Sequence, residues 1–195
     1  MAVEPEQKGE RRVEVEVDAE PELLMGYHRP DMNDPDGAAL EVVTDILGSG
    51  RTSRFYRAIV EKSKIATGVW SSASGPGERD PNLFLIGGTP QAPHTTGELE
   101  QAIEKEIALL MTAGPTEMEL KKIKNNAIAG VIHGLASNQG MANQLAYYES
   151  VGGDWTRLIS DIEDIKKVSA DDVKRVLKKY LIRSNKTIAV LVKKK

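Results

Sequence analysis

The sequence contains no cysteine, no long apolar run and few aromatic residues. The absence of cysteine among the 195 residues excludes disulfides, thiolate catalysis and cysteine-ligated zinc. No apolar stretch approaches the roughly 20 residues that a membrane-spanning helix needs, so we expect no membrane span. Residues 1–12 are polar and lack the apolar centre of a secretory signal. A chain without cysteine is compatible with export, and its compartment stays open between the bacterial periplasm and the cytoplasm.

Charge is distributed unevenly between the two ends of the chain. Residues 1–22 hold eight acidic and three basic side chains, whereas residues 174–195 hold nine basic and no acidic ones. A basic end can bind nucleic acid or a membrane surface, but aromatic residues make up only 5% of the chain and none lies among the final lysines. We therefore expect no nucleic-acid partner, and ends that face each other or are simply solvated.

Hydrophobic periodicity and turn residues divide the chain into strands and helices. Three helices begin with capping boxes, which pair Thr95 with Glu98, Thr116 with Glu119, and Ser169 with Asp172. Asp34 or Asp36 is expected to cap the first helix. Strands are predicted over 11–17, 22–30, 65–74, 82–89 and 186–192, and helices over about 36–47, 52–62, 95–111, 116–137, 140–151, 154–166 and 170–181.

This order of elements predicts the fold class. Strands come in pairs that indicate hairpins, and helices come in runs, which favours an α+β domain with a mostly antiparallel sheet covered on one face by helices. A doubly wound nucleotide-binding fold needs strands and helices that alternate, so this order argues against it. Val13, Val15 and Val17 alternate with charged residues, so the first strand is expected to be half-buried. Residues 1–10, rich in Glu and Pro, are predicted to be a flexible tail or linker, and 11–195 a single domain.

The stretch LGSGRTSRFYRAIVEK, residues 47–62, raises the question of a phosphate-binding loop. Such a loop follows a strand and places a lysine next to a hydroxyl, whereas here a helix precedes the glycines and no lysine-serine pair follows. A zinc site is not supported either, because His28, His94 and His133 lack the short spacing that puts two imidazoles on one helical face. We therefore predict no catalytic residue and no metal ligand in this chain.

Several motifs give the sequence a family resemblance. The segment LGSGRTSRFYRAIVEKSKIATGVWSSAS resembles the pattern L-G-G-G-x-S-S-R-L-F-x-x-L-R-E of the insulinase/pitrilysin family of zinc metallopeptidases, which includes the mitochondrial processing peptidases. The segment AGPTEMELKKIKN is similar to the family's G-x-T-x-x-E-L helix start, and residues 145–181 are similar to its closing helices. The resemblance covers roughly residues 20–192.

The resemblance implies that this chain is a second, non-zinc domain, at the C-terminal side of a zinc-bearing one. The family binds zinc through an H-x-x-E-H motif, in which two histidines hold the metal and the glutamate activates water, and that motif is absent here. Zinc is therefore expected in a companion domain or subunit, which is the implied partner, and the chain alone is expected to be inactive. Homo- or hetero-dimers are compatible with this assignment.

In some relatives the second domain also holds an extended peptide by strand addition. The residues that correspond to this surface are those of the glycine turn and the following strand: Gly48, Gly50, Gly68, Val69, Trp70, Ser71 and Ser72. The competing interpretation places Val69 and Trp70 in the core and gives the glycines only a structural role in the turn.

Three functions are compatible with these observations. The first is the non-catalytic domain of an insulinase-like zinc metalloendopeptidase, which helps enclose and bind a peptide substrate. The second is a scaffold or partner subunit of a family member that has lost proteolysis. The third is an unrelated α+β binding module. An H-x-x-E-H motif in the companion would favour the first function over the second.

Overall fold

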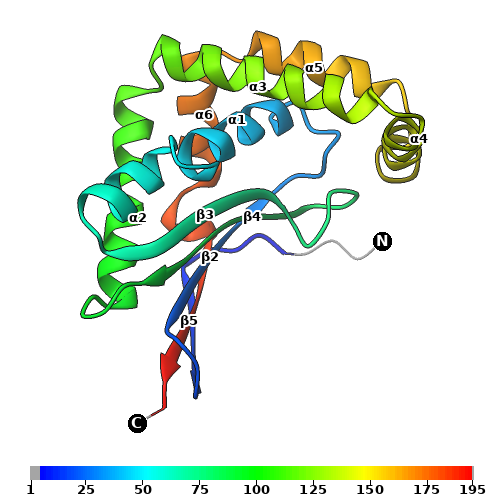
Figure 1. The fold of residues 1–195 in the computed structure, drawn as a ribbon. Coiled ribbons are helices and arrows are strands. Elements are labelled where there is room, and N and C mark those ends of the chain that lie inside the picture. Colours follow the sequence, from blue (N-terminus) through cyan, green and yellow to red (C-terminus); the bar gives the residue numbers. More distant parts are fainter. Residues whose placement is uncertain (1–4, 195) are drawn as a thin grey trace.

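The computed structural model describes residues 5–194. Its elements follow the predicted order, and the second predicted helix is a π-helix over most of its length (Figure 1). The strands are β1 (Arg11–Val17), β2 (Glu22–Arg29), β3 (Ala66–Gly75), β4 (Asn82–Pro90) and β5 (Lys186–Lys193). The helices are α1 (Gly37–Gly48), η1 (Tyr56–Lys62), α2 (Thr96–Ala113), α3 (Glu117–Leu135), α4 (Asn138–Tyr147), η2 (Tyr148–Gly152), α5 (Arg157–Lys167), α6 (Ala170–Tyr180) and the short η3 (Arg183–Asn185).

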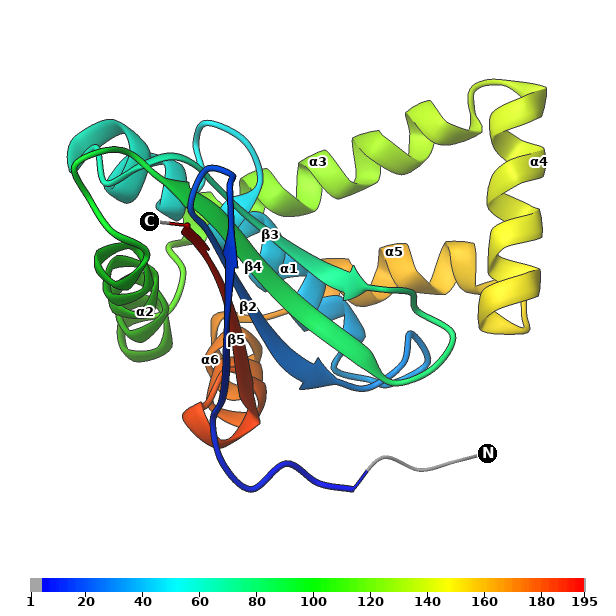
Figure 2. The same cartoon turned by 90° about the horizontal axis from the view of Figure 1, so that it is seen from below.

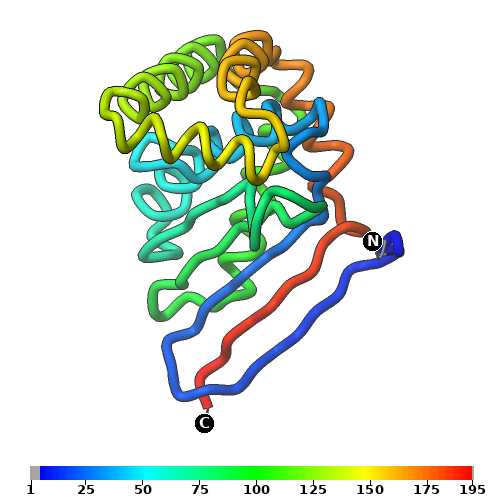
Figure 3. The backbone as a smooth tube through the Cα atoms, turned by 90° about the vertical axis from the view of Figure 1, so that its right-hand side faces the viewer, coloured from blue at the N-terminus to red at the C-terminus, as the bar shows by residue number. Residues whose placement is uncertain are grey.

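The strands form one sheet with the order β1-β5-β2-β4-β3. The pairings β5–β2, β2–β4 and β4–β3 are antiparallel, as predicted for most of the sheet, whereas β1 pairs with β5 in parallel. The expected hairpin between the first two strands is wrong, because the C-terminal strand lies between them. Figure 3 shows this arrangement, with the red C-terminal strand between two blue ones. The second hairpin, β3–β4, is confirmed.

The described helices lie on one side of the sheet, which confirms the α+β fold class (Figure 1). Helices α1, α2 and α6 contact the strands, and α3 and α5 pack on α1. The apolar stripes of the helices are largely buried and meet the inward residues of the strands. These core side chains include Leu23, Met25, Phe84, Ile86, Ile188, Leu40, Val43, Leu47, Leu99, Ile103, Leu110, Val173, Val176 and Leu177. Each contributes about 2 kcal/mol through burial of apolar surface.

The three predicted capping boxes are confirmed. In each, the side chain of Thr95, Thr116 or Ser169 accepts a hydrogen bond from the backbone of the acidic residue three positions later, which reciprocates. Asp36 occupies the N-cap position of α1 but makes no side-chain cap hydrogen bond. Its carboxylate instead accepts hydrogen bonds from Lys179 at 2.7 Å and Tyr180 at 2.8 Å, and so joins α1 to α6.

The first strand is not half-buried as expected. All seven residues of β1 are exposed, including Val13 at 52% and Val15 at 48%. The physical reason is the position of β1. It is an edge strand, and its register with β5 places its valines on the side opposite the buried Ile188 and Val190. No described helix covers that side of the sheet (Figure 2). The alternating valines therefore predicted the strand correctly, but the prediction that one side of it is buried is wrong.

The acidic N-terminal segment contacts the basic C-terminal one, which confirms the expectation that the two ends face each other. Glu10 forms ion pairs with Arg183 at 3.4 Å and Lys186 at 3.1 Å. The amide of Gln7 donates to the backbone oxygen of Lys186 at 2.8 Å. Part of the segment predicted to be a tail is thus hydrogen-bonded to β5, and the division of the chain at residue 10 stays a prediction.

Candidate functional site

The glycine turn after α1 is shaped by two different requirements. A Cβ atom on Gly48 would lie 2.4 Å from the backbone nitrogen of Ser71 and 2.9 Å from the carbonyl carbon of Trp70, so the end of α1 touches the backbone of β3. Gly50 has a φ of 73° and open space around it, a backbone conformation that favours glycine. Both glycines therefore have structural roles, in agreement with the competing interpretation.

The turn is held against α3 by an arginine. Arg54 donates to both carboxylate oxygens of Glu119 at 2.8 and 2.9 Å, and also to the backbone oxygen of Gly114 at 3.1 Å. Bidentate pairs of this kind are strong and fix orientation. Hydrogen bonds from Arg54 are the main cause that lowers the pKa of Glu119 to about 2. The arginine of the family-like motif thus fixes the turn against α3.

The strand after the turn, β3, is the last strand of the sheet and has alternating faces. Val69 is buried against the helices, and the hydroxyl of Ser71 donates to the backbone oxygen of Thr44 in α1 at 3.0 Å. Trp70 points to the opposite face and is 41% exposed. The core interpretation is therefore right for Val69 and wrong for Trp70.

The indole of Trp70 lies against the neighbouring strand. A Cβ atom on Gly87 of β4 would lie 2.4 to 2.8 Å from three atoms of that ring, so the missing side chain lets the indole lie close to the sheet. Gly68 is exposed and has nothing within 4 Å of an added Cβ, and the hydroxyl of Ser72 donates locally to Ser74 at 3.3 Å. The edge of β3 thus presents one large apolar side chain between two small residues.

Trp70 belongs to a larger apolar face that the sequence reasoning missed. Strand register places it on one side of the sheet together with Val13, Val15, Val17, Leu24, Leu83, Leu85, Ala189 and Leu191, all at least partly exposed. We call these residues the open sheet face. Contiguous exposed apolar surface of this kind marks interaction sites. The valine alternation was the available signal, since an apolar stripe can face a partner as well as a core.

The described residues form no metal-ligand cluster. No cluster of three or more His, Cys, Asp or Glu residues that could hold a metal ion occurs among them. His94 pairs with Glu98 at 3.4 Å on the exposed start of α2, without a further ligand. No described helix is both long and apolar enough to cross a membrane.

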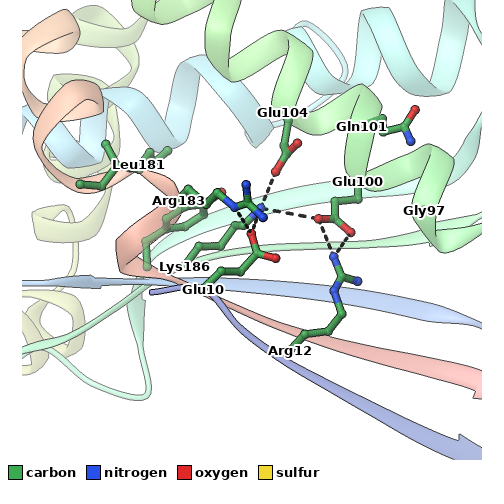
Figure 4. Close-up of a pocket in the computed structure, with 11 residues that line it drawn as sticks. Glu10, Arg12, Gly97, Glu100, Gln101, Glu104, Leu181, Arg183 and Lys186 are labelled. Carbon is green, nitrogen blue, oxygen red and sulfur yellow. Dashed lines mark hydrogen bonds and ion pairs between the residues drawn. The ribbon is translucent and has the colours of Figure 1, made fainter. Parts of the chain in front are cut away.

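A buried lysine lies at the opposite edge of the sheet (Figure 4). The side chain of Lys186 is 4% exposed and is surrounded by three carboxylates: Glu10 at 3.1 Å, Glu100 at 3.5 Å and Glu104, which accepts a hydrogen bond from it. Burial alone would lower the pKa of Lys186, but the hydrogen bonds with Glu104 and Glu10 outweigh it and raise the pKa. The lysine therefore stays charged, which suits a structural ion cluster and not a nucleophile.

A second polar cleft, of about 490 Å³, lies between the start of α1, the β3–β4 connection and α5. Arg157 donates to the backbone oxygen of Met32 at 2.8 Å and to Asp161 at 3.3 Å, and Tyr147 hydrogen-bonds to Glu78. Burial is the main cause that raises the pKa of Asp161. These contacts join α5 to the body of the domain and provide no nucleophile next to a base.

Comparison with known proteins identifies the family. The model of the peptidase M16 inactive domain matches residues 1–127. The chain belongs to this family. The resemblance to insulinase-like zinc peptidases is thereby confirmed, and the third function, an unrelated binding module, is wrong. In peptidase M16 proteins the inactive domain pairs with a zinc-bearing catalytic domain, as predicted from the sequence.

Individual relatives agree with this assignment. The chain is 27% identical over 194 residues to the zinc protease PqqE of Helicobacter pylori. The aligned region covers 96% of this chain and 42% of that protein. A crystal structure of a protease from Helicobacter pylori has a TM-score of 0.90 at 26% identity, over 96% of this chain and 45% of that one. The peptidase M16 inactive domain from Pseudomonas fluorescens shares the fold, with a TM-score of 0.76 at 23% identity over 95% of this chain and 44% of that one. The chain thus spans less than half the length of these relatives.

Proposed function

We propose that the chain is the non-catalytic domain of an insulinase-like zinc metalloendopeptidase and that it helps to enclose a peptide substrate and bind it along β3. The observation that supports the proposal is an edge strand that carries an exposed tryptophan. β3 ends the sheet, and Trp70 is 41% exposed beside Gly68 and Ser72. A strand in this position presents backbone groups to which an extended peptide can add.

Strand addition divides the recognition between backbone and side chains. Hydrogen bonds to the β3 backbone would hold any extended segment, whatever its sequence. Side chains directly opposite each other on neighbouring strands come within about 5 Å, so one substrate side chain would lie beside the indole of Trp70. Gly48 and Gly50 border this edge and set where the peptide can enter, while Val69 and Ser71 fix the strand from the buried side.

Zinc and the water-activating glutamate would come from the companion domain, and peptide cleavage would take place there.

The first prediction concerns the isolated chain. We expect the purified chain to hydrolyse no peptide and to bind zinc at well below one equivalent, because its described residues form no metal-ligand cluster. Peptidase assays and metal analysis by mass spectrometry measure both quantities.

The control for this prediction is the companion domain, alone and mixed with the chain. Activity that appears only in the mixture supports a substrate-enclosing role. Stoichiometric zinc together with peptidase activity in the purified chain would contradict the proposal. A companion without an H-x-x-E-H motif would favour the scaffold function instead.

The second prediction concerns Trp70. Trp70→Ala should weaken binding of an extended apolar peptide by roughly 5- to 30-fold, which corresponds to the 1–2 kcal/mol that a well-placed aromatic contact contributes. Trp155→Ala is the matched control, because Trp155 is the other tryptophan, is 50% exposed and lies beyond the sheet, between η2 and α5. Isothermal titration calorimetry measures both affinities.

Tryptophan fluorescence provides an independent readout. In a Trp155→Phe variant, Trp70 is the only tryptophan, so its emission should shift when a peptide covers the indole. An unchanged affinity in Trp70→Ala together with an unchanged emission on peptide addition would place peptide binding elsewhere or exclude it.

A further inference from the structure

The N-terminal segment is attached to the domain in an unusual way. Residues 7–17, which include β1, are here called the strap. Among the described strands β1 pairs only with β5, and all its side chains are exposed, so it adds no apolar side chain to the core. The other four strands form a continuous sheet without it, with their own covered core. Attachment of the strap therefore depends on backbone pairing along one edge and on polar contacts at its start.

Those polar contacts converge on one buried cation. Glu10 reaches Lys186 at 3.1 Å, while Lys186 also contacts Glu100 and Glu104 of α2 (Figure 4). Nη2 of Arg12 in the strap donates to both carboxylate oxygens of Glu100, at 2.6 and 2.8 Å.

Two hydrogen bonds also hold the strap beside this cluster. Gln7 is 9% exposed; its amide nitrogen donates to the backbone oxygen of Lys186, and its amide oxygen accepts from the hydroxyl of Thr187 at 3.2 Å. Lys186 thus links the strap, β5 and α2 through charge.

A polar anchor behaves differently from an apolar one. Removing one member of a buried ion cluster leaves the other charges uncompensated, so the attachment is lost sharply. Because the strap contributes nothing to the covered core, its loss need not unfold the remaining sheet. Release would leave the backbone edge of β5 unpaired, as a second site where a strand could add.

We propose that the strap is a releasable strand, held by the ion cluster around Lys186, that closes the β5 edge of the sheet. It opens as a unit while β2, β3, β4 and the helices stay folded. This inference does not depend on peptide binding at β3, which is the opposite edge of the sheet.

Hydrogen exchange of the whole chain tests the proposal. Glu10→Lys places a cation next to Lys186 and Arg183 and changes only the strap. It should speed exchange across residues 11–17 at least about tenfold, without changing β2 and β4. The matched control is Glu6→Lys, the same charge reversal at an exposed residue four positions earlier. It should leave exchange at β1 unchanged.

Two further variants test the anchor itself. Lys186→Met should speed exchange of β1 by about tenfold or more. Glu104 then lacks a cation, and Glu10 and Glu100 keep only their ion pairs with Arg183 and Arg12. Adding Glu104→Gln to that variant should slow exchange again, which a packing defect at residue 186 would not do. Unchanged exchange of β1 in Glu10→Lys, or an equal increase in β1, β2 and β4, would overturn the proposal.

Discussion

Replacing Gly48 with alanine is expected to lower the free energy of unfolding by about 3 kcal/mol, because backbone atoms cannot move aside as side chains can. The added Cβ would lie 2.4 Å from the nitrogen of Ser71 and 2.9 Å from the carbonyl carbon of Trp70. The end of α1 would have to move off β3. For a domain of this size, the melting temperature should fall by roughly 6–12 °C, as measured by calorimetry.

Gly50→Ala is the matched control for this prediction. Gly50 lies two residues further on and has open space around it, so only its φ of 73° disfavours a side chain there. Alanine there should cost about 1 kcal/mol, the strain of a left-handed backbone. Equal losses in the two variants would show that the approach of α1 to β3 is not the cause. The Gly48 variant should also weaken peptide binding, if β3 binds one, by displacing that edge.

Asp36→Asn is expected to destabilise the domain by about 3 kcal/mol, because it leaves cations of α6 without their buried partner. Asp36 is 5% exposed, and its carboxylate contacts Arg175, Lys179 and Tyr180. Asp171→Asn is the control, since Asp171 has an 87% exposed side chain and forms only a surface pair with Lys174. Its effect should stay within about 0.5 kcal/mol. Urea unfolding at neutral pH measures both.

Acid titration gives the same carboxylate a second test. Burial acts to raise the pKa of Asp36, but the hydrogen bonds from Lys179, Arg175 and Tyr180 outweigh it and lower the pKa to about 2. A lowered folded-state pKa contributes stability above the ordinary value of 3.8, and that stability is lost as the pH falls towards 2. The difference in stability between wild type and Asp36→Asn should therefore shrink over this range. A constant difference would contradict the assignment.

Local features of this fold could be predicted from sequence because they depend on neighbours along the chain. The capping boxes at Thr95, Thr116 and Ser169 involve residues three positions apart, and the helical stripes follow from the period of the helix. The α+β class followed from the order of these elements. The glycine turn was recognised by its pattern, although the reason for Gly48, contact with the backbone of β3, needs the structure.

Features that depend on distant segments could not be predicted in the same way. Nothing near residue 11 indicates that its strand pairs with residue 187, so the insertion of β5 between β1 and β2 was missed. Alternation of valines shows that one side of β1 is apolar, but whether a layer covers that side is decided by the whole chain. For the ion cluster at Lys186 the only signal was the opposite charge of the two ends. The outward direction of Trp70 followed from the register of β3 on β4.

The place of β5 inside the sheet has a consequence for how the domain is made. β1 and β2 are synthesised before β5, yet both pair with it; Arg11, for instance, pairs with Thr187. During synthesis β2 can already pair with β4, while β1 has no partner. Contacts so far apart in sequence slow folding. The valine-rich β1 therefore stays unpaired, with its apolar side accessible to chaperones, until β5 has been synthesised.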